Sequence, residues 1–117
     1  MIRHRIDELF APRSLAIVGA SARQGSAGHG LYRNVIAAGF EGPIGLVNRR
    51  YSEIEGRPCL PDLRALDFVP DVVAIVAPPA LVLDHARAAA DLGVAAAVVV
   101  TPDAEAGLPL TRGLRDL

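Results

Sequence analysis

A glycine-rich stretch with hydroxyl and basic side chains follows the first apolar run of the chain. It reads IVGASARQGSAGHG over residues 17–30 and contains four glycines. Glycine allows sharp turns and a close approach of backbone N–H groups to a ligand, and a helix N-terminus carries roughly half a positive charge. A phosphate at such a turn needs few further contacts. We interpret the stretch as a phosphate-binding loop, with candidate contacts from Gly19, Ser21, Arg23, Gly25, Ser26, Gly28 and Gly30.

Two adjacent arginines follow a second apolar run, PIGLVN, at residues 43–48. The usual dinucleotide pattern is G-x-G-x-x-G directly after a strand, with an acidic residue after the next strand to bind a ribose diol. This sequence has neither, because its glycines are spaced more widely and the second run ends in Asn48, Arg49 and Arg50. Arginine binds phosphate through charge-assisted hydrogen bonds, so the turn suits a phosphorylated ribose. NADP and coenzyme A both carry an adenosine with such an extra phosphate.

The elements that must position these residues alternate between strands and helices. Four apolar runs have the length of buried strands, at 14–20, 43–48, 71–77 and 94–101. Helical spacing and stop signals predict helices over 28–38 and 80–93, and short ones over 6–10, 62–66 and from 108 onward. The stretch 51–61 is interpreted as irregular. The pattern predicts an α/β fold of the Rossmann-like, doubly wound kind, a mainly parallel sheet with helices on both faces.

Ligands of such sheets bind beyond the carboxyl ends of the strands, near the point where the strand order reverses. The first two ends carry the glycine-rich loop and the arginine turn. The other two ends add small or polar residues to the candidate site, namely Ala77, Pro78, Pro79 and Thr101.

Composition limits the classes of protein that fit. The 117 residues are 51% hydrophobic with a formal net charge of −1, which predicts a single domain over 1–117 and gives no bulk charge for binding nucleic acid. All 12 basic residues are arginine, so lysine-dependent chemistry is excluded. The lone Cys59 excludes an internal disulfide and fits a reducing cytoplasm. No apolar run has the length of a membrane span or a signal peptide core.

Five segments of the sequence resemble those of a known family. The segments SLAIVGASARQGSAGHG, FEGPI, VNRRY, IEGRPCLPDL and VAPPA are similar to the N-terminal coenzyme A-binding domain of ADP-forming acyl-CoA synthetases, which is related to the succinyl-CoA synthetase α subunit. The same domain occurs in multidomain protein lysine acetyltransferases. The resemblance implies that the loop 19–28 binds the coenzyme A phosphates, and that Asn48, Arg50 and Tyr51 hold the 3′-phosphoadenosine end. It places the third and fourth strand ends beside the adenine and pantetheine path.

Two positions depart from the pattern of that family. Arg49 stands where the family usually has proline, which makes the turn more basic. After the fourth strand, TPDAEAG replaces the usual small residue, glycine and aromatic residue. Because of these substitutions, one alternative is a degenerate domain that no longer binds a ligand and serves subunit contacts. The glycine loop and the arginine pair also allow a second alternative, an NADP-binding fragment of an oxidoreductase.

Catalytic residues are not expected in this chain. In the synthetase family, acyl and phosphoryl transfer proceed through a phosphorylated histidine that lies in the following domain. The sequence gives no sign that any of the three histidines, His4, His29 and His85, is a general base paired with a residue that orients it. His85 is expected on a solvated helix face. We therefore expect a coenzyme A or acyl-CoA binding domain, excised from a longer acid–CoA ligase or acetyltransferase whose other domains are its partners. An exposed apolar edge at 94–101 would also favour a homodimer.

Overall fold

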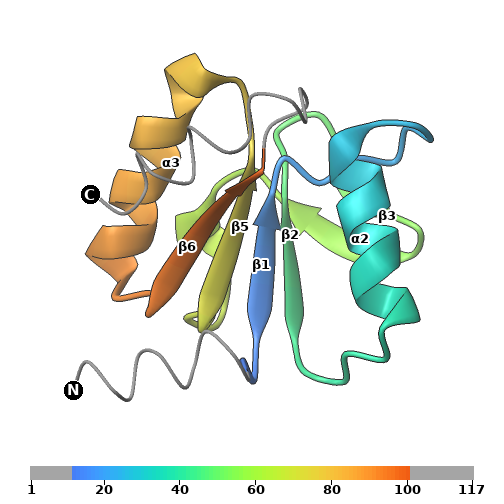
Figure 1. The fold of residues 1–117 in the computed structure, drawn as a ribbon, viewed down its shortest axis with the longest axis horizontal. Coiled ribbons are helices and arrows are strands. Elements are labelled where there is room, and N and C mark those ends of the chain that lie inside the picture. Colours follow the sequence, from blue (N-terminus) through green and yellow to red (C-terminus); the bar gives the residue numbers. More distant parts are fainter. Residues whose placement is uncertain (1–11, 101–117) are drawn as a thin grey trace.

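The computed structural model describes residues 12–100, in which a six-stranded sheet lies between helices on its two faces (Figure 1). The predicted helices at 6–10 and 108–117, and Thr101, lie outside the described residues. The elements in chain order are β1 (Leu15–Val18), α2 (Ala27–Ala37), β2 (Ile44–Val47), β3 (Glu53–Ile54), β4 (Arg57–Leu60), the 3₁₀ helix η1 (Leu63–Ala65), β5 (Val72–Val76), α3 (Pro79–Leu92) and β6 (Ala96–Val100).

The strand order defines a doubly wound sheet. It runs β3-β4-β2-β1-β5-β6, and every pair is parallel except β3 with β4. The chain moves from β1 outward to β2 and β4 and then returns to β5 on the other side of β1. The order therefore reverses between β1 and β5, and α2 and α3 cover opposite faces (Figure 1). The predicted α/β class, with a mainly parallel sheet, is confirmed.

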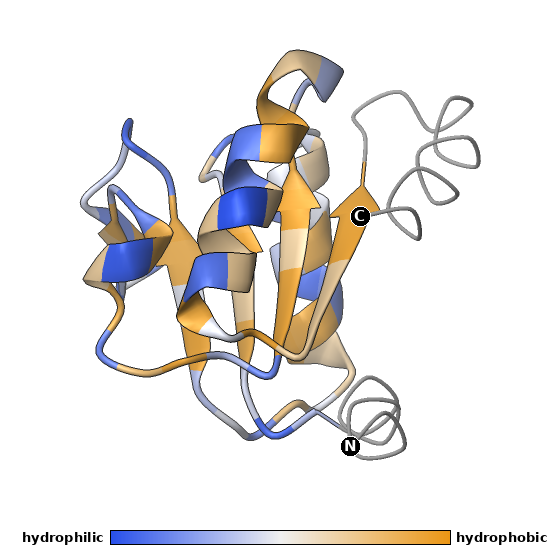
Figure 2. Cartoon of the chain, turned by 90° about the vertical axis from the view of Figure 1, so that its left-hand side faces the viewer, coloured by the Kyte–Doolittle hydropathy of each residue, from blue (hydrophilic) through white to orange (hydrophobic). Residues whose placement is uncertain are grey.

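Two apolar layers hold the helices on the sheet. On the α3 face, Ala88 and Ala89 pack over Val18 and Ile75. On the opposite face, Tyr32 of α2 belongs to the second cluster of buried side chains, which includes Ile17, Leu46 and Val76. All four residues of β2 are buried, as the continuous apolar run predicts for a strand covered on both faces. Figure 2 shows this contrast between hydrophobic strands and helices of mixed hydropathy.

The helix ends follow from local chemistry. Ser26 is the N-cap of α2, and its Oγ accepts a hydrogen bond from the His29 N–H at 3.2 Å. Pro79 occupies the first turn of α3, where its missing N–H costs nothing. Gly93 ends α3 in the left-handed conformation, with φ +82°, as its position in the sequence predicts. Within residues 12–100, no helix is both long and apolar enough to cross a bilayer.

The interpretation of residues 51–61 as irregular is wrong. The structure forms a hairpin there, with β3 antiparallel to β4, and β4 extends the sheet parallel to β2 through Leu46 and Cys59. The turn places both Glu55 (φ +50°) and Gly56 (φ +82°) in the left-handed region. The strands are too short, and Pro58 interrupts them too soon, for the sequence pattern to reveal them.

Candidate functional site

A cleft of about 510 Å³ opens at the carboxyl edge of the sheet, on the α3 side. It lies where the strand order reverses, because the ends of β1, β2 and β5 all contribute to its wall. Of the residues predicted from sequence, the structure brings six together here: Gly19, Asn48, Arg49, Arg50, Ala77 and Pro78. The predicted basic turn and the switch point therefore coincide.

The cleft also contains residues that the sequence reasoning missed. They come from the segment around η1 and from α3, and comprise Pro61, Asp62, Leu63, Arg64, Leu81, Asp84, His85 and Ala88. Arg64 is held by Asp91 at 3.2 Å and lies 3.8 Å from Asp62, so carboxylates fix its position at the rim. Because β4 ends at the carboxyl edge, η1 must begin there; recognising β4 in the sequence would have pointed to these residues. His85 is partly buried and lines the cleft, while its neighbours Asp84 and Arg87 are exposed as expected for a solvated helix face.

Two glycines are required by the close contact of β1, β5 and α2. A Cβ on Gly19, whose φ is +93°, would lie 1.9 Å from the carbonyl oxygen of Val76. A Cβ on Gly28 would lie 2.0 Å from the carbonyl oxygen of Gly19. The turn out of β1 is therefore sharp, and it lies directly against the start of α2.

Gly25 and Gly30 differ from these two. Gly25 has φ +87° with no atom within 4 Å of its Cβ direction, so it serves the turn alone. A Cβ on Gly30 would also meet open space, and the Gly30 N–H donates to the Ser26 carbonyl at 3.0 Å. The Gly30 amide is therefore used inside the helix, and the expectation that its missing side chain lets other amides approach a phosphate stays a prediction.

The serine hydroxyls of the loop are engaged by the loop itself. Ser26 Oγ donates to the Arg23 carbonyl at 2.7 Å while it caps α2. Ser21 Oγ accepts from the Arg23 N–H at 3.0 Å and lies 3.2 Å from the Tyr51 hydroxyl. The amides of Ala27 and Gly28, at the first two positions of α2, are the N–H groups that the helix geometry leaves for an anion.

Asn48 joins the basic turn to the glycine loop. Its Nδ2 donates to the Ala20 carbonyl at 2.8 Å, and its Oδ1 accepts the Arg50 N–H at 2.9 Å. Beneath it, the buried Cys59 thiol donates to the Asn48 carbonyl at 3.6 Å. Burial raises the pKa of Cys59, only partly opposed by that hydrogen bond, which makes it an unreactive core thiol.

The remaining predicted residues lie outside the lining of the cleft. Ser21, Arg23, Gly25 and Ser26 lie in the loop before α2, Gly28 lies in its first turn, and Tyr51 packs on that side of the sheet. Pro79 is the first residue of α3 and does not line the cleft. The structure thus separates the candidates into a loop at the α2 face and a cleft at the α3 face, joined through Asn48.

His29 at the start of α2 is held by the hairpin turn. Its Nε2 is 2.7 Å from Glu55 Oε2, and Arg33 donates to the other oxygen at 3.1 Å. The hydrogen bond from His29, opposed by desolvation and supported by Arg33, holds the pKa of Glu55 below its usual value. His29 thus fastens α2 to the hairpin.

This ion pair predicts an acid-dependent component of stability. A carboxyl whose pKa is lowered by folding stabilises the fold above its unfolded-state pKa and loses that effect as the pH falls through the folded-state pKa. We expect Glu55→Gln to lower the melting temperature at pH 7 more than at a pH well below the usual glutamate pKa. Glu53→Gln, an exposed neighbour in β3, is the control for loss of charge. An equal effect of Glu55→Gln at both pH values would contradict the assignment.

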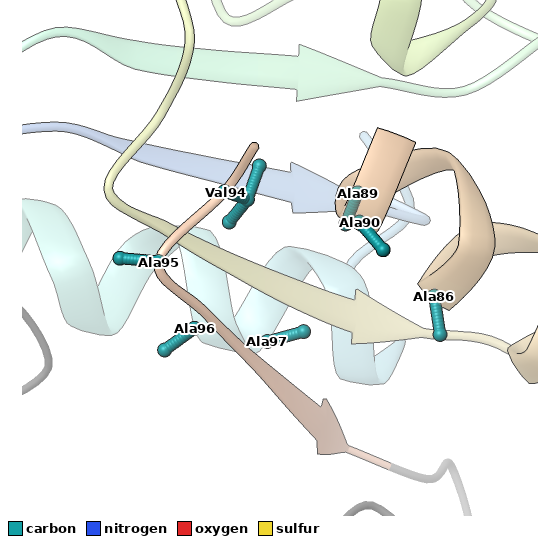
Figure 3. A pocket seen from close by; sticks show the side chains of 7 residues that line it. All are labelled: Ala86, Ala89, Ala90, Val94, Ala95, Ala96 and Ala97. Atoms are coloured by element: carbon teal, nitrogen blue, oxygen red, sulfur yellow. The ribbon is translucent and has the colours of Figure 1, made fainter. Parts of the chain in front are cut away.

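A second, smaller hollow lies at the opposite end of β6. It measures about 210 Å³ and is lined by six alanines and a valine of α3, β6 and the turn between them (Figure 3). No polar side chain contributes to it, so it does not fit a phosphorylated ligand. Among residues 12–100, no group of three or more His, Cys, Asp or Glu side chains is placed to hold a metal ion.

A parallel sheet with a glycine-rich turn and a basic cleft at its switch point is the arrangement of nucleotide-binding α/β domains. Comparison with known sequences makes this specific. The sequence profile of the CoA binding domain family matches residues 13–107, so the chain belongs to that family.

Two relatives of the chain are named as acetate–CoA ligases. The chain is 32% identical over 113 residues to the ADP-forming acetate–CoA ligase I of Archaeoglobus fulgidus, covering 96% of this chain and 16% of the ligase. It is 44% identical over 50 residues to the α subunit of the corresponding Pyrococcus furiosus ligase, which covers 43% of this chain and 11% of the subunit. The chain therefore spans a small part of the length of these enzymes.

Solved structures of similar fold include an acetyl-coenzyme A synthetase. A dinucleotide-forming acetyl-coenzyme A synthetase of Candidatus Korarchaeum cryptofilum matches with a TM-score of 0.73 and 30% identity, over 76% of this chain and 19% of that one. A conserved hypothetical protein of P. furiosus matches with a TM-score of 0.71 and 32% identity, over 89% and 86% of the two chains. The chain is a CoA-binding domain related to ADP-forming acyl-CoA synthetases. These comparisons give no support to the oxidoreductase or acetyltransferase alternatives.

Proposed function

We propose that this chain binds coenzyme A, or its acyl thioester, across the carboxyl edge of the sheet. The pyrophosphate lies at the loop 19–28, against the first amides of α2. The 3′-phosphoadenosine occupies the cleft beside Arg49 and Arg50. The ends of β5 and β6 border the adenine and pantetheine path, through Ala77, Pro78, Pro79 and Thr101.

The observation that carries this proposal is the hydrogen bond from Asn48 Nδ2 to the Ala20 carbonyl, 2.8 Å long. The pyrophosphate and the 3′-phosphate of coenzyme A belong to one nucleotide, so the groups that bind them must lie side by side. Asn48 fixes the arginine turn against the glycine loop before any ligand arrives, since its Oδ1 also holds the Arg50 amide. A preformed site avoids the cost of ordering these segments on binding.

The size and charge of the cleft support the same ligand. Its volume of about 510 Å³ falls within the range of about 300–1,000 Å³ that is typical of small-molecule sites. Arg49, Arg50 and Arg64 outnumber the carboxylates of Asp62 and Asp84 in its lining, and apolar surface comes from side chains that include Ala77, Pro78 and Leu81. A flat adenine and a phosphorylated ribose fit such a mixture of positive charge and apolar surface.

Within a longer protein, we propose that the domain presents coenzyme A to an acid–CoA ligase centre formed by further domains. The chain itself contributes binding and no catalytic residue to that reaction. The named relatives support this role, because the chain matches only a small part of each ligase. Placement in the cytoplasm and a homodimer through the β6 edge stay predictions from the sequence.

Calorimetric titration and thermal shift test the proposal directly. Coenzyme A, dephospho-coenzyme A, NADP and ATP are compared at equal concentrations. Coenzyme A is expected to bind most tightly, and at about 100 times its dissociation constant to stabilise the fold by about 2.7 kcal/mol. NADP tests whether any phosphorylated adenosine suffices, since it lacks pantetheine. A shift with NADP but none with millimolar coenzyme A would overturn the proposed function.

A further inference from the structure

The Ser21 and Tyr51 hydroxyls lie 3.2 Å apart and connect the glycine loop to the start of the hairpin. Ser21 Oγ also accepts the Arg23 N–H at 3.0 Å. Tyr51 follows Arg50 directly in the chain, yet only Arg50 lines the cleft. Tyr51 instead packs against the cluster of buried side chains on the α2 face.

The hydrogen bonds of this pair decide which hydroxyl proton is free to donate to a ligand. Each hydroxyl has one proton and two acceptor lone pairs. One proton is used between the two oxygens, whichever of them donates, and the Arg23 amide occupies a lone pair on Ser21. If Tyr51 donates, both lone pairs of Ser21 are filled and the Ser21 proton is directed away from the protein oxygens. That proton then lies in the loop whose other donors are the first amides of α2.

We propose that Tyr51 is a positioning residue for the pyrophosphate of coenzyme A, acting through Ser21, and has no contact with the 3′-phosphate. This inference rests on the proposed function and changes the role that the family resemblance gives to Tyr51. Tyr51 donates to Ser21 Oγ, and Ser21 donates its own proton to a pyrophosphate oxygen. The serine gains a fixed direction because two protein donors hold its oxygen.

The other tyrosine of the chain supplies a matched control. The Tyr32 hydroxyl accepts a hydrogen bond from Arg57 Nε at 3.2 Å, so it also fastens α2 to the hairpin. Tyr32 is buried on the same face of the sheet but belongs to neither the loop nor the cleft. Loss of its hydroxyl therefore disturbs the hairpin without removing a group from the ligand site.

The test measures dissociation constants by titration for Tyr51→Phe, Ser21→Ala, the double variant and Tyr32→Phe, with coenzyme A and dephospho-coenzyme A as probes. Tyr51→Phe is expected to weaken both ligands by the same factor, about three- to tenfold, as for loss of support to one hydrogen bond to a charged group. The double variant is expected to bind no more weakly than Ser21→Ala alone, because Tyr51 acts only through Ser21. Tyr32→Phe is expected to bind like the wild type.

Three results would overturn the inference. One is a larger loss for coenzyme A than for dephospho-coenzyme A in Tyr51→Phe, which would place Tyr51 at the 3′-phosphate. Another is unchanged binding by Tyr51→Phe, and the third is equal weakening by Tyr32→Phe, which would mean a general effect on the hairpin. A wild-type chain that binds no coenzyme A would instead overturn the proposed function, so the two failures are distinguishable.

Discussion

Charge reversal of Arg50 to glutamate is expected to weaken coenzyme A binding by about 10- to 150-fold, the effect of losing about 1.5–3 kcal/mol from a hydrogen bond to a charged group. Dephospho-coenzyme A is expected to lose much less, because it lacks the 3′-phosphate that we propose the guanidinium binds in the cleft. The ratio of the two losses measures the selectivity of this turn, and titration calorimetry gives both dissociation constants.

The control for net charge is Arg13→Glu. Arg13 is exposed and precedes β1, at the edge of the sheet opposite the cleft, so its reversal changes the total charge equally without touching the site. It is expected to leave both affinities close to wild type at physiological ionic strength, where screening acts over about 8 Å. Equal losses for the two ligands in Arg50→Glu would remove Arg50 from the 3′-phosphate.

Substitution of Gly28 by alanine is expected to destabilise the fold by about 3 kcal/mol, the upper part of the usual range for overpacking. The added Cβ would lie 2.0 Å from the Gly19 carbonyl oxygen, and a backbone atom cannot rotate away. Relief of that clash requires α2 to move off β1. The same movement would displace the first amides of α2, so weaker binding of coenzyme A should accompany the loss of stability.

Gly30→Ala is the matched variant in the same helix. Its Cβ would meet no atom within 4 Å, so it is expected to stabilise the protein by about 0.5–1 kcal/mol through the lower backbone entropy of alanine in the unfolded chain. Denaturant unfolding of both variants gives the comparison. Similar stability changes for the two substitutions would contradict the packing of α2 against Gly19.

The sheet could be predicted in large part from the sequence. The apolar runs at 14–20, 43–48, 71–77 and 94–101 each contain one of the parallel strands β1, β2, β5 and β6. A strand buried on both faces needs apolar residues throughout, and the sequence displays that need directly. The hairpin was not visible, because its strands are stabilised by pairing with β2 and by contacts with α2, which no local pattern reports.

The candidate site was predictable to a smaller extent. The arginine turn and Ala77–Pro78 were found because residues at carboxyl ends of strands share one edge, and the cleft joins them. Arg64, Asp84 and His85 were missed, since their sequence neighbourhoods resemble ordinary polar helix faces. The sequence predicts both serines as ligands, and only the folded chain shows that the Ser26 proton is used by the Arg23 carbonyl, whereas Ser21 Oγ is held by the Arg23 amide and lies beside the Tyr51 hydroxyl.

By itself, the sequence determined the order of the elements, the glycine-rich turn after β1 and the basic turn after β2, because strand burial and backbone freedom are local properties of residue type. Only the tertiary structure decided which of those residues face one cavity, and which hydroxyls and amides remain for a ligand. A hydrogen bond such as that from Asn48 to Ala20 joins residues 28 positions apart, and each polar group that it uses is no longer available for binding. Which polar groups stay available to a ligand therefore depends on the geometry of the whole domain.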